Sequence, residues 1–394
     1  MKILHTVEFY SPSVGGAQEV VRQLSERLAK RGHKVTVATT RLPQRTAREI
    51  NGVQIAEFDV TGNAVRGLRG EVERYREFVR YGSFDVMMNY AAQQWTTDAL
   101  FPLLQLLPFP KVLVPCGFSA LENPEYSSYF AVMPHVMDQY DHLIFLSNTY
   151  RDIAFARRHG LQRCCIIPNG AAEEEFSRPD PSFRARYGIP DDAFVLLTVG
   201  SHTGLKGHRL CIEAFQQAHI PGGILVIIGN ILHGPNCLPD CRRRAAFLRF
   251  RSMGRKRVLL LDPPRRDVVA AYHASDIFAF GSNIECSPLV LFEAMAARLP
   301  FITVACGNAQ EIIEWSRGGL LVNTEQVGRG HVEGSRTHMA SLIEQMYADR
   351  AMRRQLGDAG HSAWSKSYTW ERIVDQYEQL YLRLGVGSPS EHVE

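Results

Sequence analysis

Strands and helices alternate along both halves of this 394-residue chain, and the alternation limits the folds open to it. Short apolar runs predict buried strands. They lie at 2–7, 34–39, 53–58, 85–89, 111–114 and 142–146 in the first half, and at 194–199, 224–228, 258–261, 277–280 and 301–304 in the second. Helical patterns near 17–31, 70–80, 96–106, 127–139 and 149–158 separate most of the first set. We therefore expect an α/β fold of two doubly wound domains, each a parallel sheet covered by helices.

A cluster of residues that break regular structure separates the two halves. It comprises Pro168, Asn169, Gly170, Pro179, Pro181, Gly188 and Pro190. We expect one domain at 1–170, a linker at 171–190 and a second domain at 191–367. The remaining segment, 368–394, begins with a helical pattern whose apolar positions are Trp370, Ile373, Val374, Tyr377, Leu380 and Tyr381.

The composition is typical of an ordinary globular chain, with 45% hydrophobic and 22% charged residues. The formal net charge of +3 is too small to indicate a nucleic-acid partner, and we expect none. No stretch approaches the ~20 apolar residues of a membrane-spanning helix. The opening run 1–7 is too short and polar for the core of a signal peptide, so we expect a cytoplasmic protein.

The eight cysteines are expected to be free and mostly buried, as in a reducing compartment. His233, Cys237 and Cys241 have a spacing that metal ligands can have, but a fourth ligand at a convincing spacing is missing. We therefore expect no metal site.

Two glutamates eight residues apart, Glu285 and Glu293, mark the strongest candidate for a functional site. The run before them predicts a strand and the alanine-rich run 291–297 a helix, so Glu285 lies in the loop and Glu293 about one turn into the helix. The backbone N–H groups of Leu289 and Val290 then lie at a helix N-terminus, which suits an anion. Carboxylates that bind hydroxyls beside amides that bind phosphate would suit a sugar nucleotide. The alternative is that Glu293 complements the helix dipole and Glu285 is an ordinary loop acid.

Glycine-rich segments follow the first strand of each half. Gly15 and Gly16 follow one, and the segment 200–207, with Gly200 and Lys206, follows the other. Open parallel sheets bind ligands at the carboxyl ends of their strands, and glycines let a phosphate approach the backbone. Lys206 can neutralise a diphosphate. The alternative is that these are turn glycines and a solvated lysine.

Five segments in this order resemble the retaining GT-B glycosyltransferases of family 4, the glycosyl transferases group 1. They are 12–19 with the strand entry at 31–37, Pro168-Asn169-Gly170 with Phe176, the segment 199–207, the segment 285–293 and the segment 307–311. The resemblance implies two Rossmann-like domains facing across a cleft. The first binds the acceptor, the second binds the nucleotide sugar, and the helix at 368–394 returns to the first.

The resemblance also implies roles for individual side chains. Lys206 would hold the donor diphosphate, Glu293 the ribose hydroxyls and Glu285 the hydroxyls of the transferred sugar. Lys206 and Glu285 are the expected catalytic residues, because negative charge grows on the departing diphosphate beside them. The nucleoside-diphosphate sugar is a substrate, and neither a metal nor a cofactor is expected.

The rest of the implied donor site is largely backbone. Leu289 and Val290 would offer amides to the β-phosphate, and Gly16 would approach the phosphate from the first domain. Gly200 opens the loop that carries the lysine, and Asn308 would line the outer edge of the pocket.

One position departs from the family pattern, because Ser201 stands where an arginine usually accompanies the lysine. Arg265, Arg266 or a protonated His202 are the candidates to replace that charge. The sequence assigns no general base.

The segment 241–257 carries eight basic residues and no acidic one. One interpretation is an interfacial helix that contacts the inner face of a membrane. The other is a helix that packs its apolar stripe on the sheet with its arginines in water.

We therefore expect a retaining glycosyltransferase that moves a sugar from a nucleoside-diphosphate sugar to a glycan or lipid-linked acceptor, in the synthesis of cell-surface polysaccharide or glycoconjugate. Two alternatives stay open. One is a catalytically silent GT-B protein that binds sugar nucleotides or glycans. The other is a different GT-B enzyme, such as a sugar-nucleotide epimerase.

Overall fold

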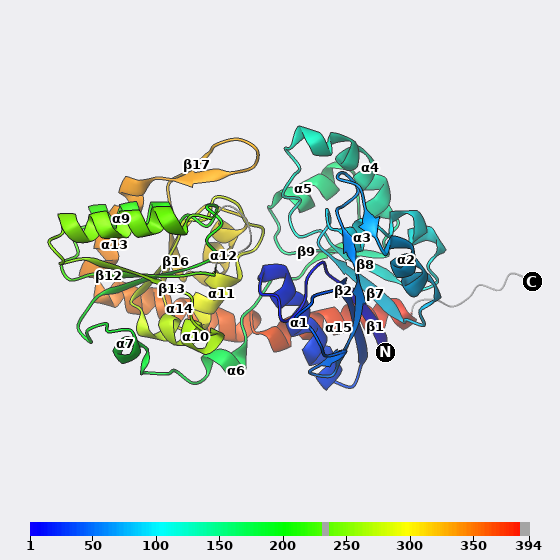
Figure 1. Ribbon diagram of the computed structural model, residues 1–394, viewed down its shortest axis with the longest axis horizontal. Helices are drawn as coiled ribbons and strands as arrows, with labels where there is room; N and C mark the ends of the chain where they lie inside the picture. The colour runs from blue at the N-terminus through cyan, green and yellow to red at the C-terminus, as the bar shows by residue number, and fades with distance from the viewer. Residues whose placement is uncertain (231–235, 387–394) are drawn as a thin grey trace, which may run out of the picture. The chain divides into compact units, whose positions relative to one another are not determined.

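The computed structural model describes residues 1–230 and 236–386, which form two compact units (Figure 1). Unit 1 comprises Met1–Asn169 together with the C-terminal segment from Trp370, and unit 2 comprises Gly170–Thr369. Among the described residues, no helix combines the length and the apolar character needed to cross a bilayer.

Unit 1 is built on an eight-stranded sheet with the order β10-β9-β8-β7-β1-β2-β4-β3. Its strands are β1 (Lys2–Thr6), β2 (Lys34–Thr40), β3 (Glu49–Ile50), β4 (Val53–Phe58), β7 (Val86–Tyr90), β8 (Lys111–Val114), β9 (His142–Phe145) and β10 (Cys164–Ile166). All neighbours pair in parallel except β3 and β4. Its helices are α1 (Gly16–Lys30), α2 (Val72–Tyr81), α3 (Trp95–Asp98), α4 (Ser127–Asp138), α5 (Arg151–Arg158) and α15 (Trp370–Val386), with 3-10 helices at Phe101–Leu106 and Pro124–Tyr126 and a small sheet of β5 (Val60–Thr61) and β6 (Arg69–Gly70).

Helix α15 belongs to unit 1 although unit 2 precedes it in the chain. All six of its predicted apolar positions are buried. The hydroxyl of Tyr381 lies 3.1 Å from Nε2 of His5, whose Nδ1 lies 2.8 Å from the Ser25 hydroxyl. Burial lowers the pKa of His5 to about 3, so this histidine is a neutral, structural residue.

Unit 2 has a six-stranded, all-parallel sheet with the order β13-β12-β11-β14-β15-β16. The strands are β11 (Val195–Val199), β12 (Ile224–Ile228), β13 (Arg257–Leu261), β14 (Ile277–Phe280), β15 (Phe301–Val304) and β16 (Gly319–Val322). The helices are α6 (Glu173–Phe176), α7 (Phe183–Arg186), α8 (His208–Gln217), α9 (Leu238–Arg251), α10 (Arg265–Ala274), α11 (Leu289–Ala296), α12 (Ala309–Ser316), α13 (Arg336–Ala348) and α14 (Arg350–Ser367). A short hairpin pairs β17 (Thr324–Gln326) with β18 (Val332–Gly334).

Successive residues of the unit 2 strands enter two different cores, because side chains alternate between the faces of a sheet. Leu197 and Phe278 pack in a cluster with α10, α11, α12 and α14. Leu196 and Ile277 pack in a cluster with α8, α9 and α13. Both faces are therefore covered, as the continuous apolar runs predicted.

The expected linker at 171–190 is part of unit 2 and not a free connection. Phe176, Phe183 and Ile189 are buried in the unit 2 core. Ala171 forms a β-bridge with Thr369, and its carbonyl accepts a 3.2 Å hydrogen bond from Nε1 of Trp364. The prolines and glycines indicated irregular backbone, but the segment contains the short helices α6 and α7, and three large apolar side chains anchor it to the second unit.

Candidate functional site

The strand order of the unit 2 sheet reverses between β11 and β14, which lie side by side at its centre. From β11 the chain proceeds outward through β12 and β13, and from β14 it proceeds the other way through β15 and β16. The loops that follow β11 and β14 therefore diverge, and an open α/β sheet binds its ligands in the crevice between such loops. These two loops contain Lys206 and Glu285.

The structure brings Lys206 and Glu285 together, 79 positions apart in the chain. Nζ of Lys206 donates a 2.6 Å hydrogen bond to Oε1 of Glu285, and the Ser282 hydroxyl donates to the same oxygen at 2.9 Å. The Lys206 side chain is 31% exposed and the Glu285 side chain 16% exposed. The pair is thus fixed in place but open to a ligand.

The path of the lysine loop depends on Gly207. Its φ is +68°, in the left-handed region, and a Cβ at this position would lie 1.8 Å from the carbonyl oxygen of Gly281. Backbone N–H of Asn283 also donates to the carbonyl of Leu205 at 2.8 Å. The two loops are therefore in direct backbone contact, which positions Lys206 against Glu285.

Helix α11 begins where the sequence predicted a helix N-terminus. It begins at Leu289 after Pro288, and Leu291 N–H donates to the Pro288 carbonyl at 3.2 Å. The N–H groups of Leu289 and Val290 lie in the first turn, where a helix offers donors without an acceptor inside the helix. Glu293 follows one turn later and is buried.

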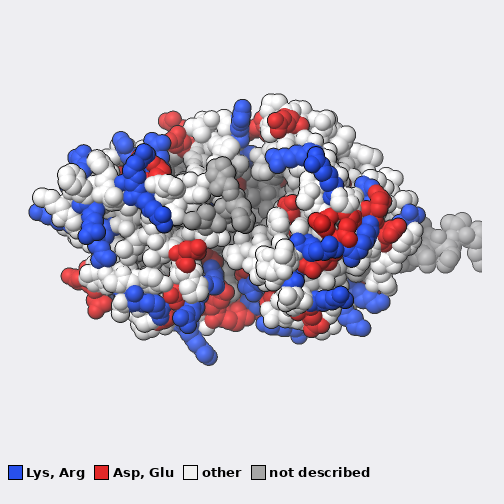
Figure 2. All heavy atoms as spheres, viewed as in Figure 1, with Lys and Arg blue, Asp and Glu red and all other residues white. Residues whose placement is uncertain are grey.

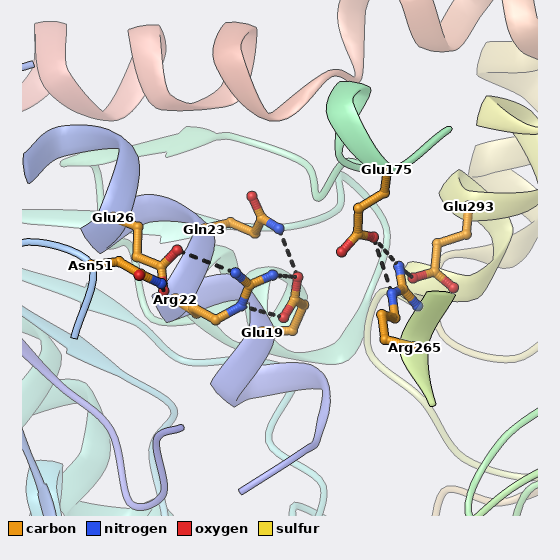
Figure 3. Close-up of polar contacts among 8 residues, drawn as sticks. All are labelled: Glu19, Arg22, Gln23, Glu26, Asn51, Glu175, Arg265 and Glu293. Atoms are coloured by element: carbon orange, nitrogen blue, oxygen red, sulfur yellow. Dashed lines mark hydrogen bonds and ion pairs between the residues drawn. The ribbon is translucent and has the colours of Figure 1, made fainter. Parts of the chain in front are cut away.

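Glu293 is engaged by Arg265 at the start of α10 (Figure 3). Nη2 of Arg265 lies 2.6 Å from Oε1 of Glu293 and 2.5 Å from Oε2 of Glu175, and the Tyr272 hydroxyl donates to Oε2 of Glu293 at 2.9 Å. Burial alone would lower the pKa of Arg265, but the Glu293 and Glu175 charges outweigh it and raise the pKa well above its usual value. Arg265 is therefore a permanent cation between two carboxylates.

Two of the three candidates to replace the arginine missing at Ser201 are arginines that bind carboxylates, and the third is a histidine. The Ser201 hydroxyl donates to Oδ1 of Asn230 at 2.6 Å. Arg265 binds the Glu293 end of the site and Arg266 lies 3.3 Å from Asp267. Burial lowers the pKa of His202, which disfavours the protonated form. Lys206 is thus the cation that the structure places at Glu285.

Two further predicted residues, Asn308 and Gly200, lie beside the loops that contain Glu285 and Lys206. Gly307 has a φ of +59°, and a Cβ there would lie 2.5 Å from the carbonyl oxygen of Cys286, to which Asn308 N–H donates at 2.9 Å. Asn308, at the start of α12, is thereby held against the segment after Glu285. Gly200 follows β11, and its N–H donates to the Ile228 carbonyl at 2.9 Å.

Gly16 lies in unit 1, as the first residue of α1. A Cβ at this position would meet nothing within 4 Å, so packing within the described chain does not require glycine here. Figure 3 shows the neighbouring helical ion pairs, in which Arg22 binds Glu19 at 2.7 Å and Glu26 at 3.2 Å.

A pair of acids that was not predicted from the sequence lies at the carboxyl edge of the unit 1 sheet. Glu8 follows β1, and Asp98 ends the short helix α3 after β7, the neighbouring strand. Burial raises the pKa of Asp98 to about 6, and burial together with the Asp98 charge raises the pKa of Glu8. Their position after two adjacent parallel strands was the available signal.

Two family models match the chain. The model of the glycosyl transferases group 1 matches residues 179–363, and the model of glycosyltransferase family 4 matches residues 14–175. Together they span most of both units.

Curated relatives include glycosyltransferases and a synthase. The D-inositol 3-phosphate glycosyltransferase of Xylanimonas cellulosilytica is 28% identical over 57% of this chain, and the match spans about half (53%) of that relative. The enzyme of the same name from Corynebacterium glutamicum is 26% identical over 96% of this chain and 94% of its own. The N-acetyl-alpha-D-glucosaminyl L-malate synthase of Bacillus anthracis is 23% identical over 94% of each chain.

Solved structures share the fold. Sucrose-phosphate synthase from Thermosynechococcus elongatus has a TM-score of 0.79 at 22% identity, covering 98% of this chain and 100% of its own. HepE from Anabaena, solved in complex with UDP-glucose, has a TM-score of 0.75 at 19% identity with the same coverage. The predicted fold class, GT-B with two doubly wound Rossmann-like domains, is confirmed.

Proposed function

Because the chain belongs to the glycosyl transferases group 1, we propose that it moves a sugar from a nucleoside-diphosphate sugar to an acceptor hydroxyl with retention of anomeric configuration. The observation that carries this proposal is the Lys206–Glu285 pair at the switch point of the unit 2 sheet, with Glu293 one turn into the next helix.

Each group has a chemical task in this proposal. Lys206 and the N-terminal amides of α11 stabilise the negative charge that grows on the departing diphosphate. Glu285 holds Lys206 in place and accepts hydrogen bonds from the transferred sugar. Glu293 accepts hydrogen bonds from the ribose, and Arg265 and Tyr272 fix its orientation. Because lysine and backbone dipoles supply the charge, transfer proceeds without a metal ion at the donor.

The donor class is tested by titrating the protein with UDP, GDP, ADP, CMP and their sugar conjugates, in EDTA and in Mg²⁺. UDP-glucose, which HepE binds, is the first choice. A ligand at a hundred times its Kd adds about 2.7 kcal/mol of stability, which a thermal shift detects. We expect a shift with one nucleotide that persists in EDTA. A shift that requires Mg²⁺ would contradict the metal-independent proposal.

The two carboxylates around Arg265 provide a matched pair of variants. Glu293→Gln should weaken nucleotide binding by about 10–100-fold, the range for losing a hydrogen bond to a charged group. Glu175→Gln removes the other carboxylate but leaves the proposed ribose ligand, and should change the affinity by less than about threefold. Equal losses in the two variants would mean that Arg265, and not Glu293, determines binding.

Retention is tested by NMR of the product's anomeric proton at early times. Retention of the donor configuration is the expected outcome, and inversion would overturn that part of the proposal.

The alternative is a catalytically silent protein that binds sugar nucleotides, and the specific argument for it is Ser201 in place of the usual arginine. Tight nucleotide binding without transfer or donor hydrolysis would favour this alternative.

We further propose a glycan or lipid-linked acceptor, reached at a membrane surface through α9. Phe247, Phe250 and Met253 are 52%, 82% and 76% exposed and lie among arginines. Figure 2 shows basic side chains gathered over the region where Figure 1 places α9. Exposed apolar groups beside clustered cations suit an anionic lipid surface.

The competing possibility is a small polar acceptor, because the names of two relatives contain inositol 3-phosphate and L-malate.

Sedimentation with vesicles of anionic or neutral phospholipid tests the contact. We expect binding to anionic vesicles only, and loss of most of it in the double variant Phe250→Ser, Met253→Ser. The control is Val132→Ser, which removes an exposed valine (53%) from unit 1. Equal binding of the wild type to neutral vesicles, or none to either, would contradict the proposal.

A further inference from the structure

Four side chains with metal-ligating atoms meet in unit 2. They are His202, His208, Cys237 and Cys241, and one ligand atom from each lies within 4.8 Å of the other three. The spacing of the two cysteines was recognisable in the sequence, but the two histidines lie about thirty residues earlier and were not predicted as ligands. His233, the third residue considered there, lies outside the described residues.

Four of the six distances among these atoms match the edges of a tetrahedron around one small ion, and the other two, from Sγ of Cys241 to the histidines, are within 4.8 Å. The two histidine Nδ1 atoms are 3.2 Å apart, and the two sulfurs 3.9 Å. Sγ of Cys237 lies 3.4 Å from Nδ1 of His202 and 3.6 Å from Nδ1 of His208. With Zn–N about 2.0–2.1 Å and Zn–S about 2.3 Å, tetrahedral edges are about 3.3 Å for N–N, 3.6 Å for N–S and 3.8 Å for S–S.

Local structure fixes the four residues. His202 lies in the loop after β11, where its N–H donates to the Asn230 carbonyl at 2.9 Å and its carbonyl accepts from Cys237 N–H at 3.1 Å. His208 is the first residue of α8, and Cys237 is the N-cap of α9. Cys241 stands four residues further, so both sulfurs lie on one face of α9.

The site is mostly buried, with Cys237 partly exposed, and its ligands are selective. His202 and His208 are each 2% exposed and Cys241 1%. Two thiolates and two imidazoles form a complete ligand set for structural zinc, whereas Mg²⁺ and Ca²⁺ prefer oxygen ligands. A Cys237–Cys241 disulfide would require the sulfurs to approach from 3.9 Å to about 2.05 Å.

We propose that His202, His208, Cys237 and Cys241 bind one structural Zn²⁺ ion. The ion joins the N-termini of α8 and α9 to the loop after β11. His202 and His208 flank Lys206 in sequence, so the metal stiffens the loop that presents this lysine. The ion takes no part in transfer, which is why a metal site here and metal-independent chemistry at the donor are compatible.

The first test is the metal content of the full chain, expressed with zinc, purified without a histidine tag and dialysed without strong chelator. Mass spectrometry should find about one zinc per chain. Co²⁺ added to demetallated protein should give the intense visible bands of tetrahedral cobalt thiolate. Zinc far below stoichiometry, with no such cobalt spectrum, would overturn the proposal.

Variants locate the site. Cys241→Ser and His208→Asn should each lower zinc affinity by more than the ~10–100-fold that loss of an outer partner costs. Cys164→Ser, a half-buried thiol in unit 1, is the matched control and should keep its zinc. Unchanged zinc in both site variants would overturn the assignment, and the wild-type measurement stands even if a variant fails to fold. Zinc content does not depend on nucleotide binding, so this inference and the proposed function can fail separately.

Discussion

At the residue scale, the contact between Gly207 and Gly281 determines the path of the loop that carries Lys206. In Gly207→Ala, the new methyl would meet the Gly281 carbonyl in a backbone conformation that alanine disfavours. We expect a loss of at least about 2–3 kcal/mol of stability in unit 2, with weaker nucleotide binding, measured by urea unfolding and titration. Gly16→Ala, where a Cβ meets open space, should leave stability unchanged within about 1 kcal/mol. Equal losses of stability in the two variants would contradict the proposed role of the Gly207–Gly281 contact.

Asp98 gives a pH dependence with a definite sign. Its folded pKa is about 6, above its ordinary value of 3.8, because burial penalises the charged form. The folded state therefore binds more protons than the unfolded state between these values, and stability falls as pH rises from about 4 to 6. A shift of this size corresponds to about 3 kcal/mol.

Asp98→Asn removes this titration. Relative to the wild type, the variant should become more stable by about 2–3 kcal/mol as pH rises from 4 to 7. Urea unfolding at several pH values measures the difference. The altered hydrogen bonds to Ala64 and Tyr129 shift this difference in unfolding free energy by the same amount at every pH. A difference that does not vary with pH would therefore show that the pKa of Asp98 is not raised in the folded protein.

Local sequence predicted some contacts of the site and missed others. Glu285, Glu293 and Lys206 each follow a recognisable strand, and strand order then determines that their loops meet. The partners of Glu293 were not predictable in this way, because Arg265 and Tyr272 come from α10 and reach it only through tertiary packing. As metal ligands, His202 and His208 were missed for the same reason.

At the element scale, α15 is held to α1 by charge as well as by its apolar face. Arg31 lies 2.7 Å from each of Glu371, Asp375 and Glu378. Its side chain is 23% exposed, so solvent screens the attraction only in part.

Arg31→Met should lower the free energy of unfolding by about 1 kcal/mol, and by less at high salt. Arg74→Met, which removes an exposed pair with Glu71, should cost less than about 0.5 kcal/mol. Urea unfolding at two salt concentrations makes the comparison, and a salt-independent loss would point to packing.

The strands were predicted better than the segments between and after them. The bounds expected for β4, β8, β12, β14 and β15 coincide with those in the structure, because buried parallel strands are short continuous apolar runs. The helix expected at 96–106 is divided into α3 and a 3-10 helix, with Pro102 at the start of the second piece. Strand β16 and helices α13 and α14 were not specified.

At the scale of the whole molecule, each unit has its own sheet and its own buried clusters. Residues 170–369 should therefore fold when expressed alone and bind the nucleotide through Lys206, Glu285 and Glu293. Circular dichroism and titration test this, and a fragment that folds but does not bind would show that unit 1 supplies part of the nucleotide affinity. The complementary truncation after Thr369 should leave unit 2 intact but destabilise unit 1, which loses Trp370, Tyr377 and Tyr381 from its interior.

The discontinuous chain path of unit 1 has a consequence for synthesis. A ribosome releases β1 to β10 first, then the roughly 200 residues of unit 2, and only afterwards α15. At about 5–20 residues per second, the nascent unit 1 waits some 10–40 s for its last helix. During that interval the groups that α15 covers, among them His5 and Met88, remain open to chaperones or to self-association. The rate at which unit 2 is translated therefore limits how early unit 1 can close.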